Sequence, residues 1–200
     1  MRAVGTLHEK LVFGRRARVL ANALAATIPA AARSILDVGC GDGTIDVIVR
    51  EKRPEISIVG VDVLVRPAPH IHVTKFDGVH LPFEDNSFDT VMFVDVLHHT
   101  NDPSVLLREA RRVAKLGIVI KDHTMDGLFS YPILRFMDWV GNAHHGVALP
   151  YNYWARSRWE REFHELGLKV QGLNINLGLY PFPASLIFER NLHFVAFLQV

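Results

Sequence analysis

Apolar and polar residues alternate along this chain in blocks that fit strands and helices in turn. Dense apolar runs predict five strands, and helix-compatible stretches follow the first and fourth of them. Alternation of this kind is typical of an α/β fold with a doubly wound, mostly parallel sheet. The expected strands are 34–38, 56–63, 71–76, 88–94 and 116–121, and the two helices are 44–52 and 103–113.

The two ends of the chain complete this plan. Apolar residues at helical spacing in the stretch 19–32 predict a helix that Pro29 stops. Arg15, Arg16 and Arg18 followed by this apolar stretch also resemble a secretory leader. A helix over 153–166 and two strands, 168–177 and 191–199, should close the fold. The last two strands predict an antiparallel hairpin, which makes seven strands in total.

We therefore expect one domain over residues 1–200. Residues 1–33 should form a helical cap, and 34–122 the core that binds a cofactor. Residues 123–152 break the alternation with aromatic side chains, glycines and histidines, which predicts a lid over the site. Residues 153–200 supply the terminal helix and hairpin.

Composition narrows the function classes. Lys plus Arg total 22 against 21 Asp plus Glu, so no basic field favours nucleic acid. The single cysteine, Cys40, excludes a disulfide framework and suits a reducing cytoplasm. No stretch reads as a spanning helix, since Asn174, Asn176 and two prolines interrupt the apolar residues 170–188.

A glycine turn after the first strand indicates a cofactor site. Gly39, Gly41 and Gly43 stand at alternate positions between a strand and a helix, where bare backbone can approach a ligand. The spacing differs from that of dinucleotide-binding turns, and Asp42 would sit badly beside a pyrophosphate. The turn therefore suits a cofactor that has no phosphate and has a positive centre.

Five sequence blocks follow one another in order: Asp37 to Gly43, Val59 to Asp62, Phe76 to Gly78, Leu81 to Thr90, and Val94 to His99 with the helix that follows. Together they resemble the blocks of the class I S-adenosylmethionine-dependent methyltransferases, of the small-molecule type grouped as methyltransferase type 11. The resemblance covers residues 34–122 and implies a Rossmann-like fold and S-adenosyl-L-methionine as the cofactor.

The resemblance also implies roles for individual residues. Asp62 should accept the ribose hydroxyls, Val63 should give adenine an apolar face, and Asp77 with Gly78 should meet the adenine amino group. The alternative for Asp77 is a simple Asp-Gly turn. The turn itself, Asp37, Gly39, Cys40 and Gly41, should lie against the homocysteine part. Asp95 should face the amino and sulfonium region.

Histidines near the strand ends are the candidates for acceptor chemistry. A base is needed only if the methyl acceptor must lose a proton. His98 and His99 follow the fourth strand, His123 follows the fifth, and His144-His145 lies in the lid. We expect at least one of His98 and His99 to be structural, and we favour His99 as the one that contacts the acceptor. Scattered His and Asp residues could imitate a metal site, but no ligand spacing supports one, so we expect no metal.

The aromatic residues of the lid indicate the class of acceptor. They could form a second core, or they could line a pocket for an apolar, aromatic or lipid-like small molecule. We expect methyl transfer to such a metabolite, to oxygen in preference to nitrogen or carbon. The alternatives are a cofactor-binding scaffold or partner subunit, and a non-methylating enzyme that uses the same site.

Overall fold

The order of elements agrees with the pattern read from the sequence. The computed structural model describes residues 2–142 and 149–200. Its strands are β1 (Ser34–Val38), β2 (Ser57–Asp62), β3 (Val73–Lys75), β4 (Phe88–Val94), β5 (Ala114–His123), β6 (Lys169–Asn174) and β7 (His193–Gln199). Its helices are α1 (Arg2–Thr27), α2 (Thr44–Lys52), α3 (Pro103–Val113), α4 (Ser130–Asn142), α5 (Arg156–Glu165) and α6 (Ser185–Phe188), with a 3-10 turn η1 (Leu97–His99).

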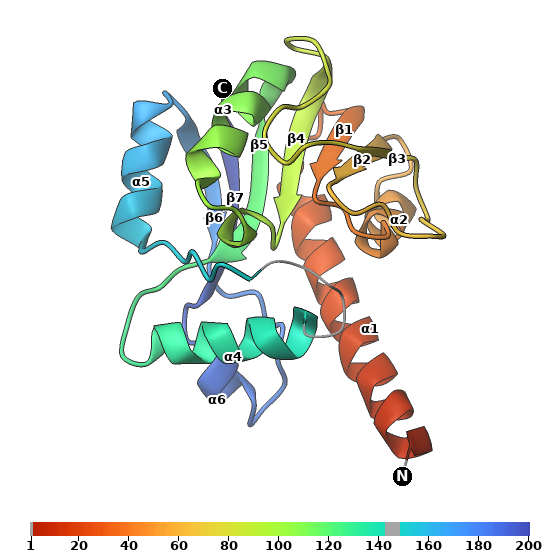
Figure 1. Ribbon diagram of the computed structural model, residues 1–200, viewed down its shortest axis with the longest axis vertical. Helices are drawn as coiled ribbons and strands as arrows, with labels where there is room; N and C mark the ends of the chain where they lie inside the picture. The colour runs from red at the N-terminus through yellow and green to blue at the C-terminus, as the bar shows by residue number, and fades with distance from the viewer. Residues whose placement is uncertain (1, 143–148) are drawn as a thin grey trace.

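The seven strands form one sheet in the order β3-β2-β1-β4-β5-β7-β6 (Figure 1). The first five strands in this order are parallel, and β7 runs antiparallel to both β5 and β6. The direction of winding reverses between β1 and β4, and ligands of such sheets bind outside the carboxyl ends of the strands at that point. The prediction of a doubly wound α/β sheet with an antiparallel end is confirmed.

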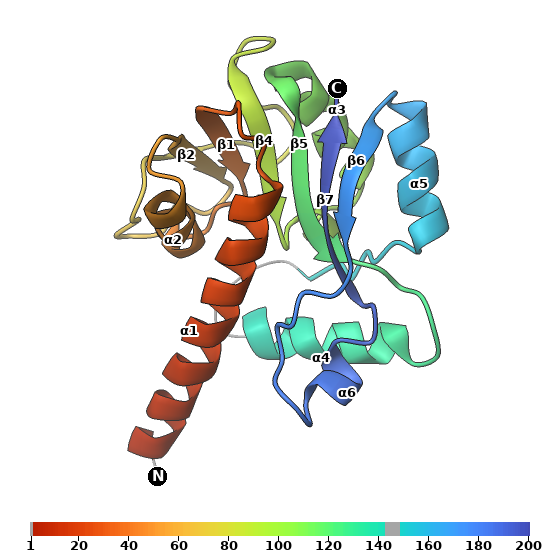
Figure 2. The ribbon, with the colours of Figure 1, turned by 180° about the vertical axis from the view of Figure 1, so that it is seen from behind.

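Helices cover both faces of the sheet (Figures 1 and 2). Along β1, Ile35 packs with α1 and α2, and its neighbour Leu36 packs with α3 and α5. Successive side chains of a strand point to opposite faces, so both layers bury apolar residues from the same strands. The same alternation holds in β7, where Phe194 and Ala196 join one core and Val195 joins the other.

Several element bounds differ from those expected. Helix α1 already begins at Arg2 and ends at Thr27, shortly before Pro29. Strand β3 has three residues and lies at the edge of the sheet, where its neighbour is β2. Helix α5 starts at Arg156, and Tyr153 and Trp154, which were expected within it, lie before it outside regular structure. The last two strands are joined by residues 175–192, which include the unexpected helix α6, so they do not form a tight hairpin.

Candidate active site

The glycine turn lies at the carboxyl end of β1 and leads into α2. All three glycines have positive φ values, 78° at Gly39, 61° at Gly41 and 78° at Gly43, which favour glycine. A Cβ atom on Gly39 would lie 2.6 Å from Val96, and one on Gly43 would lie 2.6 Å from Ile71. A Cβ on Gly41 would meet nothing within 4 Å. Gly39 and Gly43 therefore serve packing, and Gly41 faces open space.

Asp62 joins the end of β2 to this turn. Its Oδ2 accepts the Gly41 N–H at 2.9 Å, and its Oδ1 accepts the Leu64 N–H at 2.8 Å. Each carboxylate oxygen has a second lone pair, so both can accept a further hydroxyl. The side chains of Val63 and Leu64 are exposed beside it. This arrangement suits a ribose next to an apolar surface, as the resemblance implies.

Asp77 makes the turn after β3. Its Oδ1 accepts the backbone N–H groups of Val79 and His80, both at 2.7 Å, and its Oδ2 lies 2.9 Å from His80 Nδ1. These hydrogen bonds lower the pKa of the carboxyl to about 2. Gly78 has φ 84°, and a Cβ there would lie 3.1 Å from Val63. The structure therefore shows an Asp-Gly turn at Asp77, and the contact of Asp77 with an adenine amino group stays a prediction.

Cys40 packs inside the molecule. A Cβ on Gly60 of β2 would lie 2.2 Å from the Cys40 Sγ, so the thiol fills the space that this glycine leaves. Burial and the nearby Asp37 raise the thiol pKa. A thiol that stays protonated is a poor nucleophile, and a packing role follows.

A pair of carboxyl groups lies buried beneath the turn. Asp37 on β1 and Asp46 on α2 are both buried, and Asp37 Oδ1 and both Asp46 oxygens have no hydrogen-bond partner among the described residues. Burial, with Asp46 and Asp62 nearby, raises the Asp37 pKa well above its ordinary value. Burial raises the pKa of Asp46 to about 7. No pattern in the sequence singled out Asp46.

Asp95 follows β4 and forms the centre of a charged cluster. It pairs with Lys121 on β5, and it lies 3.0 Å from Arg16 Nη2 and 3.3 Å from His123 Nε2. Burial opposes ionisation of Asp95, but the charges of Lys121 and Arg16 hold its pKa well below the ordinary value. Asp95 thus stands at the predicted edge of the sheet, with three basic side chains already around it.

His98 lies in a second buried cluster. Its Nδ1 is 2.6 Å from Asp122 Oδ1, and its Nε2 is 3.2 Å from Asp138 Oδ1 on α4. Tyr153 donates to the other Asp138 oxygen at 2.5 Å. Burial opposes protonation of His98, but the two carboxylates raise its pKa to about 10. Both nitrogens of His98 thus face carboxylates, which favours a structural role for this residue.

His99 and His123 remain as candidates for a base. The His98 ring lies 4.1 Å from the His99 ring and 4.7 Å from the His123 ring, so the structure brings the three together. Burial and the charged His98 lower the pKa of His99, and burial and Lys121 lower that of His123 well below its ordinary value. Both are therefore neutral. His99 is partly exposed and His123 is buried, which favours His99. His144-His145 lies outside the described residues.

Among residues 2–142 and 149–200, two groups of side chains are close enough to hold a metal ion: His98 with Asp122 and His123, and His98 with His99 and Asp138. The ligand atoms of each group lie within 4.8 Å of one another. Both groups need a His98 nitrogen that already faces a carboxylate. A metal ion would have to displace that proton and break the pair.

The sequence reasoning missed Lys121, Asp138, Tyr153 and His193. Lys121 comes directly before Asp122 in a parallel strand, and parallel strands end at one edge of the sheet, so its position carried a usable signal. His193 lies 3.5 Å from Lys121, and Asp138 and Tyr153 come from α4 and the segment before α5. No spacing in the sequence links these two to His98.

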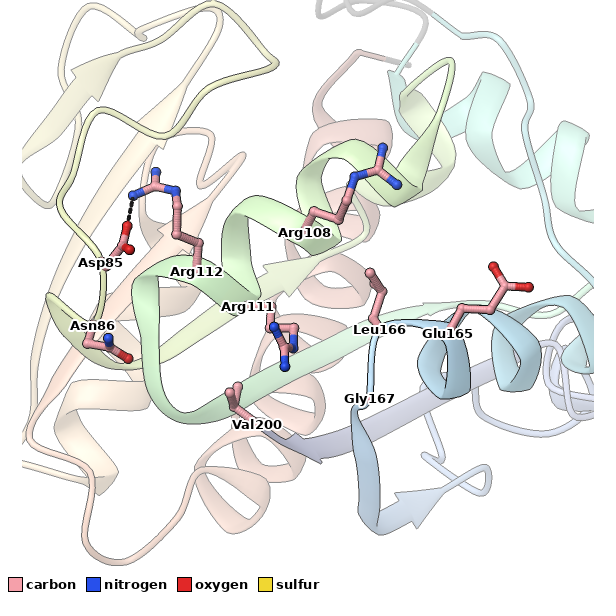
Figure 3. Close-up of a pocket in the computed structure, with 9 residues that line it drawn as sticks. All are labelled: Asp85, Asn86, Arg108, Arg111, Arg112, Glu165, Leu166, Gly167 and Val200. Carbon is pink, nitrogen blue, oxygen red and sulfur yellow. Dashed lines mark hydrogen bonds and ion pairs between the residues drawn. The ribbon is translucent and has the colours of Figure 1, made fainter.

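A surface groove lies away from these clusters (Figure 3). It runs between α3 and the end of α5, with Arg108, Arg111 and Arg112 along one side. Asn86, just before β4, and Val200, just after β7, also line it, which places it at the amino ends of the parallel strands. It contains none of the candidate site residues.

In the part of the chain that the structure describes, no helix is both long and apolar enough to cross a bilayer.

Part of the chain matches a known protein family and several curated proteins. The family model described as a methyltransferase domain matches residues 36–120. A demethylmenaquinone methyltransferase of Roseiflexus castenholzii is 31% identical over 127 residues, which cover 58% of this chain and 52% of that protein. The chain spans 34% to 52% of the length of the first curated relatives it matches.

Solved structures agree on the fold. The methyltransferase in a complex with the Haloferax volcanii Trm112 methyltransferase activator gives a TM-score of 0.67 at 20% identity, over 96% of this chain and 93% of that one. An S-adenosylmethionine-dependent methyltransferase from Mesorhizobium loti gives 0.64 at 16% identity, over 90% and 96%. Residues 36–120 therefore match the model of a methyltransferase domain, and the fold of the chain is similar to that of solved methyltransferases, one of them S-adenosylmethionine-dependent.

Proposed function

We propose that this protein transfers a methyl group from S-adenosylmethionine to an oxygen of a small apolar or aromatic molecule. One observation carries the proposal. The Asp62 carboxylate is bound to the amide of Gly41, the glycine of the turn that faces open space, at the carboxyl end of the parallel strands. Bare backbone next to a strand-end carboxylate is the arrangement that holds a nucleoside.

The described residues fit this cofactor. Asp62 would hold the ribose, Val63 and Leu64 would cover one side of the adenine, and the backbone at Gly41 would lie against the homocysteine part. When bound, the cofactor supplies an electrophilic methyl group. The protein's contribution is to align the acceptor with that methyl and to exclude water.

His99 is the proposed base for an oxygen acceptor. A hydroxyl group must lose its proton as the new bond to carbon forms, and a neutral imidazole can take it. Burial and, after it, repulsion by the His98 imidazolium lower the pKa of His99 and keep it neutral. An acceptor hydroxyl that approaches between His99 and the glycine turn would meet both the base and the methyl group.

Calorimetric titration with S-adenosylmethionine and S-adenosylhomocysteine tests the cofactor assignment. We expect binding to the wild-type protein, and a loss of at least about tenfold in affinity for Asp62→Ala, because removal of a buried hydrogen-bonding group at a ligand site costs about 1.4 kcal/mol or more. Glu51→Ala, an exposed change on α2, is the control. Absence of binding by the folded wild-type protein contradicts the proposal.

Turnover tests the acceptor assignment. With a panel of phenols and hydroxylated apolar molecules, we expect His99→Gln to lower kcat by about a hundredfold, the usual contribution of a positioned base. The affinity for S-adenosylhomocysteine should stay unchanged. If His99→Gln lowered kcat and the affinity for S-adenosylhomocysteine by the same factor, His99 would belong to the cofactor site instead. Methylation of amines alone would refute oxygen as the acceptor atom.

The relative that is named for demethylmenaquinone supports an aromatic or lipid-like acceptor. A second candidate function is that of a subunit whose turnover needs a partner, since one matching structure is a methyltransferase in complex with an activator. Turnover by the purified chain alone would exclude this second candidate.

A further inference from the structure

Helix α4 exposes apolar side chains on the side that faces away from the sheet. Leu134 and Asp138 are buried, and they lie on one side of the helix because they are four residues apart. Phe136, Trp139 and Val140 lie on the opposite side and are all exposed. A helix whose outer side is aromatic and aliphatic does not match the usual pattern of a water-facing surface.

Helix α6 and the loop before it extend this surface. The rings of Phe136 and Phe188 stack with their centroids 6.3 Å apart, which joins α6 to α4. Leu186 and Ile187 on α6 are exposed, and Phe182 in the preceding loop is 79% exposed. We call the whole set the α4–α6 apolar face, and its members are Phe136, Trp139, Val140, Phe182, Leu186 and Ile187.

The α4–α6 apolar face lies at the functional end of the molecule. Figures 1 and 2 both show α4 and α6 beyond the carboxyl ends of β4 and β5, away from the groove at the other end of the sheet. The inner side of α4 supplies Asp138 to His98, and the next residue, Trp139, is exposed. One helix thus contacts the buried cluster with one side and presents an apolar surface with the other.

The charged residues on and near α4 and α6 indicate whether a protein or a membrane binds the α4–α6 apolar face. By sequence, α4 and α6 contain two charged residues, Arg135 and Asp138. Asp138 is buried and Arg135 is exposed, and Arg190 just after α6 is exposed as well. Protein interfaces surround an apolar centre with polar groups of both signs. Glu189, between α6 and Arg190, is half-buried and accepts the Tyr180 N–H, so the exposed charges on α4 and just after α6 in the described residues are those of the two arginines. An aromatic and aliphatic surface with exposed arginines beside it is typical of segments that lie in a membrane interface.

We propose that the α4–α6 apolar face docks on a lipid bilayer, with its aromatic and aliphatic side chains among the acyl chains and the arginines at the head groups. This docking does not depend on the proposed methyl transfer. The bound segment would lie on the membrane and would not span it. The active-site end of the sheet would then face the lipid.

The protein carries its own reporter for this docking. Trp139 is 58% exposed, whereas Trp154 and Trp159 are 1% and 3% exposed. A change of environment at the α4–α6 apolar face should therefore appear as a change in Trp139 fluorescence. Vesicles of phosphatidylcholine, with and without phosphatidylglycerol, are the probe.

We expect vesicles to shift the tryptophan emission to shorter wavelength and to carry the protein upward in a flotation gradient. The double variant Phe136→Ser and Leu186→Ser, which keeps Trp139, should lose about tenfold or more in vesicle partitioning, since it removes two apolar side chains from the inserted surface. Val170→Ser on β6, which removes an equally exposed apolar side chain elsewhere, is the control and should bind as the wild type does.

Three results would overturn the proposal. The first is no shift and no flotation with either vesicle. The second is equal binding by the double variant and the wild type when both show cooperative unfolding. The third is a stable dimer in sedimentation whose Trp139 is already protected from acrylamide without lipid, because a second copy would then cover this face.

The vesicle experiment needs no cofactor, so its failure and that of the proposed function can be told apart. The double variant should still bind S-adenosylhomocysteine in calorimetry. Asp62→Ala should still bind vesicles.

Discussion

The fold disfavours a negative charge on the two carboxyl groups beneath the glycine turn. Asp37 supports the turn from β1, and Asp46 faces it from the first turn of α2. Both are buried, so ionisation of either one is opposed by the loss of water, and ionisation of both places like charges together. The pair therefore keeps a proton to a higher pH than ordinary carboxyl groups do.

Replacement of Asp46 by Asn should stabilise the protein, and more so at pH 8 than at pH 5. The Asp46 pKa is about 7 in the folded protein and 3.8 ordinarily, so the wild type loses stability as pH rises from about 4 to 7. Asn removes that loss. The measurement is the difference in Tm between variant and wild type across this range. A difference that is constant with pH would show that Asp46 does not titrate in the folded state.

At the scale of elements, the His98 cluster fastens α4 to the sheet. His98 after β4, Asp122 at the end of β5 and Asp138 on α4 meet in the interior. The three groups come from segments that are far apart in the chain. Their contact fixes the position of α4 against the sheet.

His98→Ala should lower the free energy of unfolding by about 3–5 kcal/mol, because it leaves buried carboxylates without their cation. Asp138→Asn keeps the shape and one hydrogen bond, so it should cost less. Urea unfolding at pH 7 gives both values. The His98 contribution is fully present below pH 6.5 and declines as pH approaches 10, since the folded pKa is raised to that value. Equal effects of the two variants would contradict this account.

The sequence predicts the strands and helices of residues 34–122 well, and it predicts the packing of α4 poorly. Residues 34–122 carry both the apolar period and the family blocks, so their strands, the glycine turn and Asp62 could be placed in advance. The role of Asp138 depends on the packing of α4 against the sheet, and nothing local indicates it. Asp95 was expected at the correct edge, but its three basic partners come from α1 and β5, and sequence order alone does not bring them together.

At the scale of the whole molecule, buried basic groups should make the protein sensitive to mild acid. His193 lies beside Lys121, and burial with that neighbour lowers its pKa to about 3; His123 is lowered for the same reasons. Stability from such groups is present above pH 6.5 and is lost as pH falls below it. Asp46 acts in the opposite direction between pH 7 and 4.

His193→Gln should therefore flatten the loss of stability between pH 6.5 and 5. The Tm of the wild type relative to the variant should fall over this range. His72→Gln, which changes a histidine outside this cluster, is the control and should leave the pH dependence as in the wild type. If the His193 variant keeps the full acid sensitivity, His193 is not one of the responsible groups.

The strand order β5-β7-β6 has a consequence for the synthesis of the chain. Strand β6 leaves the ribosome before β7, yet its neighbour in the sheet is β7. Until residues 193–199 emerge, β6 has no strand to pair with, and the apolar surfaces that Phe194, Val195 and Ala196 later cover stay open to other nascent chains. The parallel half of the sheet can assemble during translation, while the other edge must wait for the final strand.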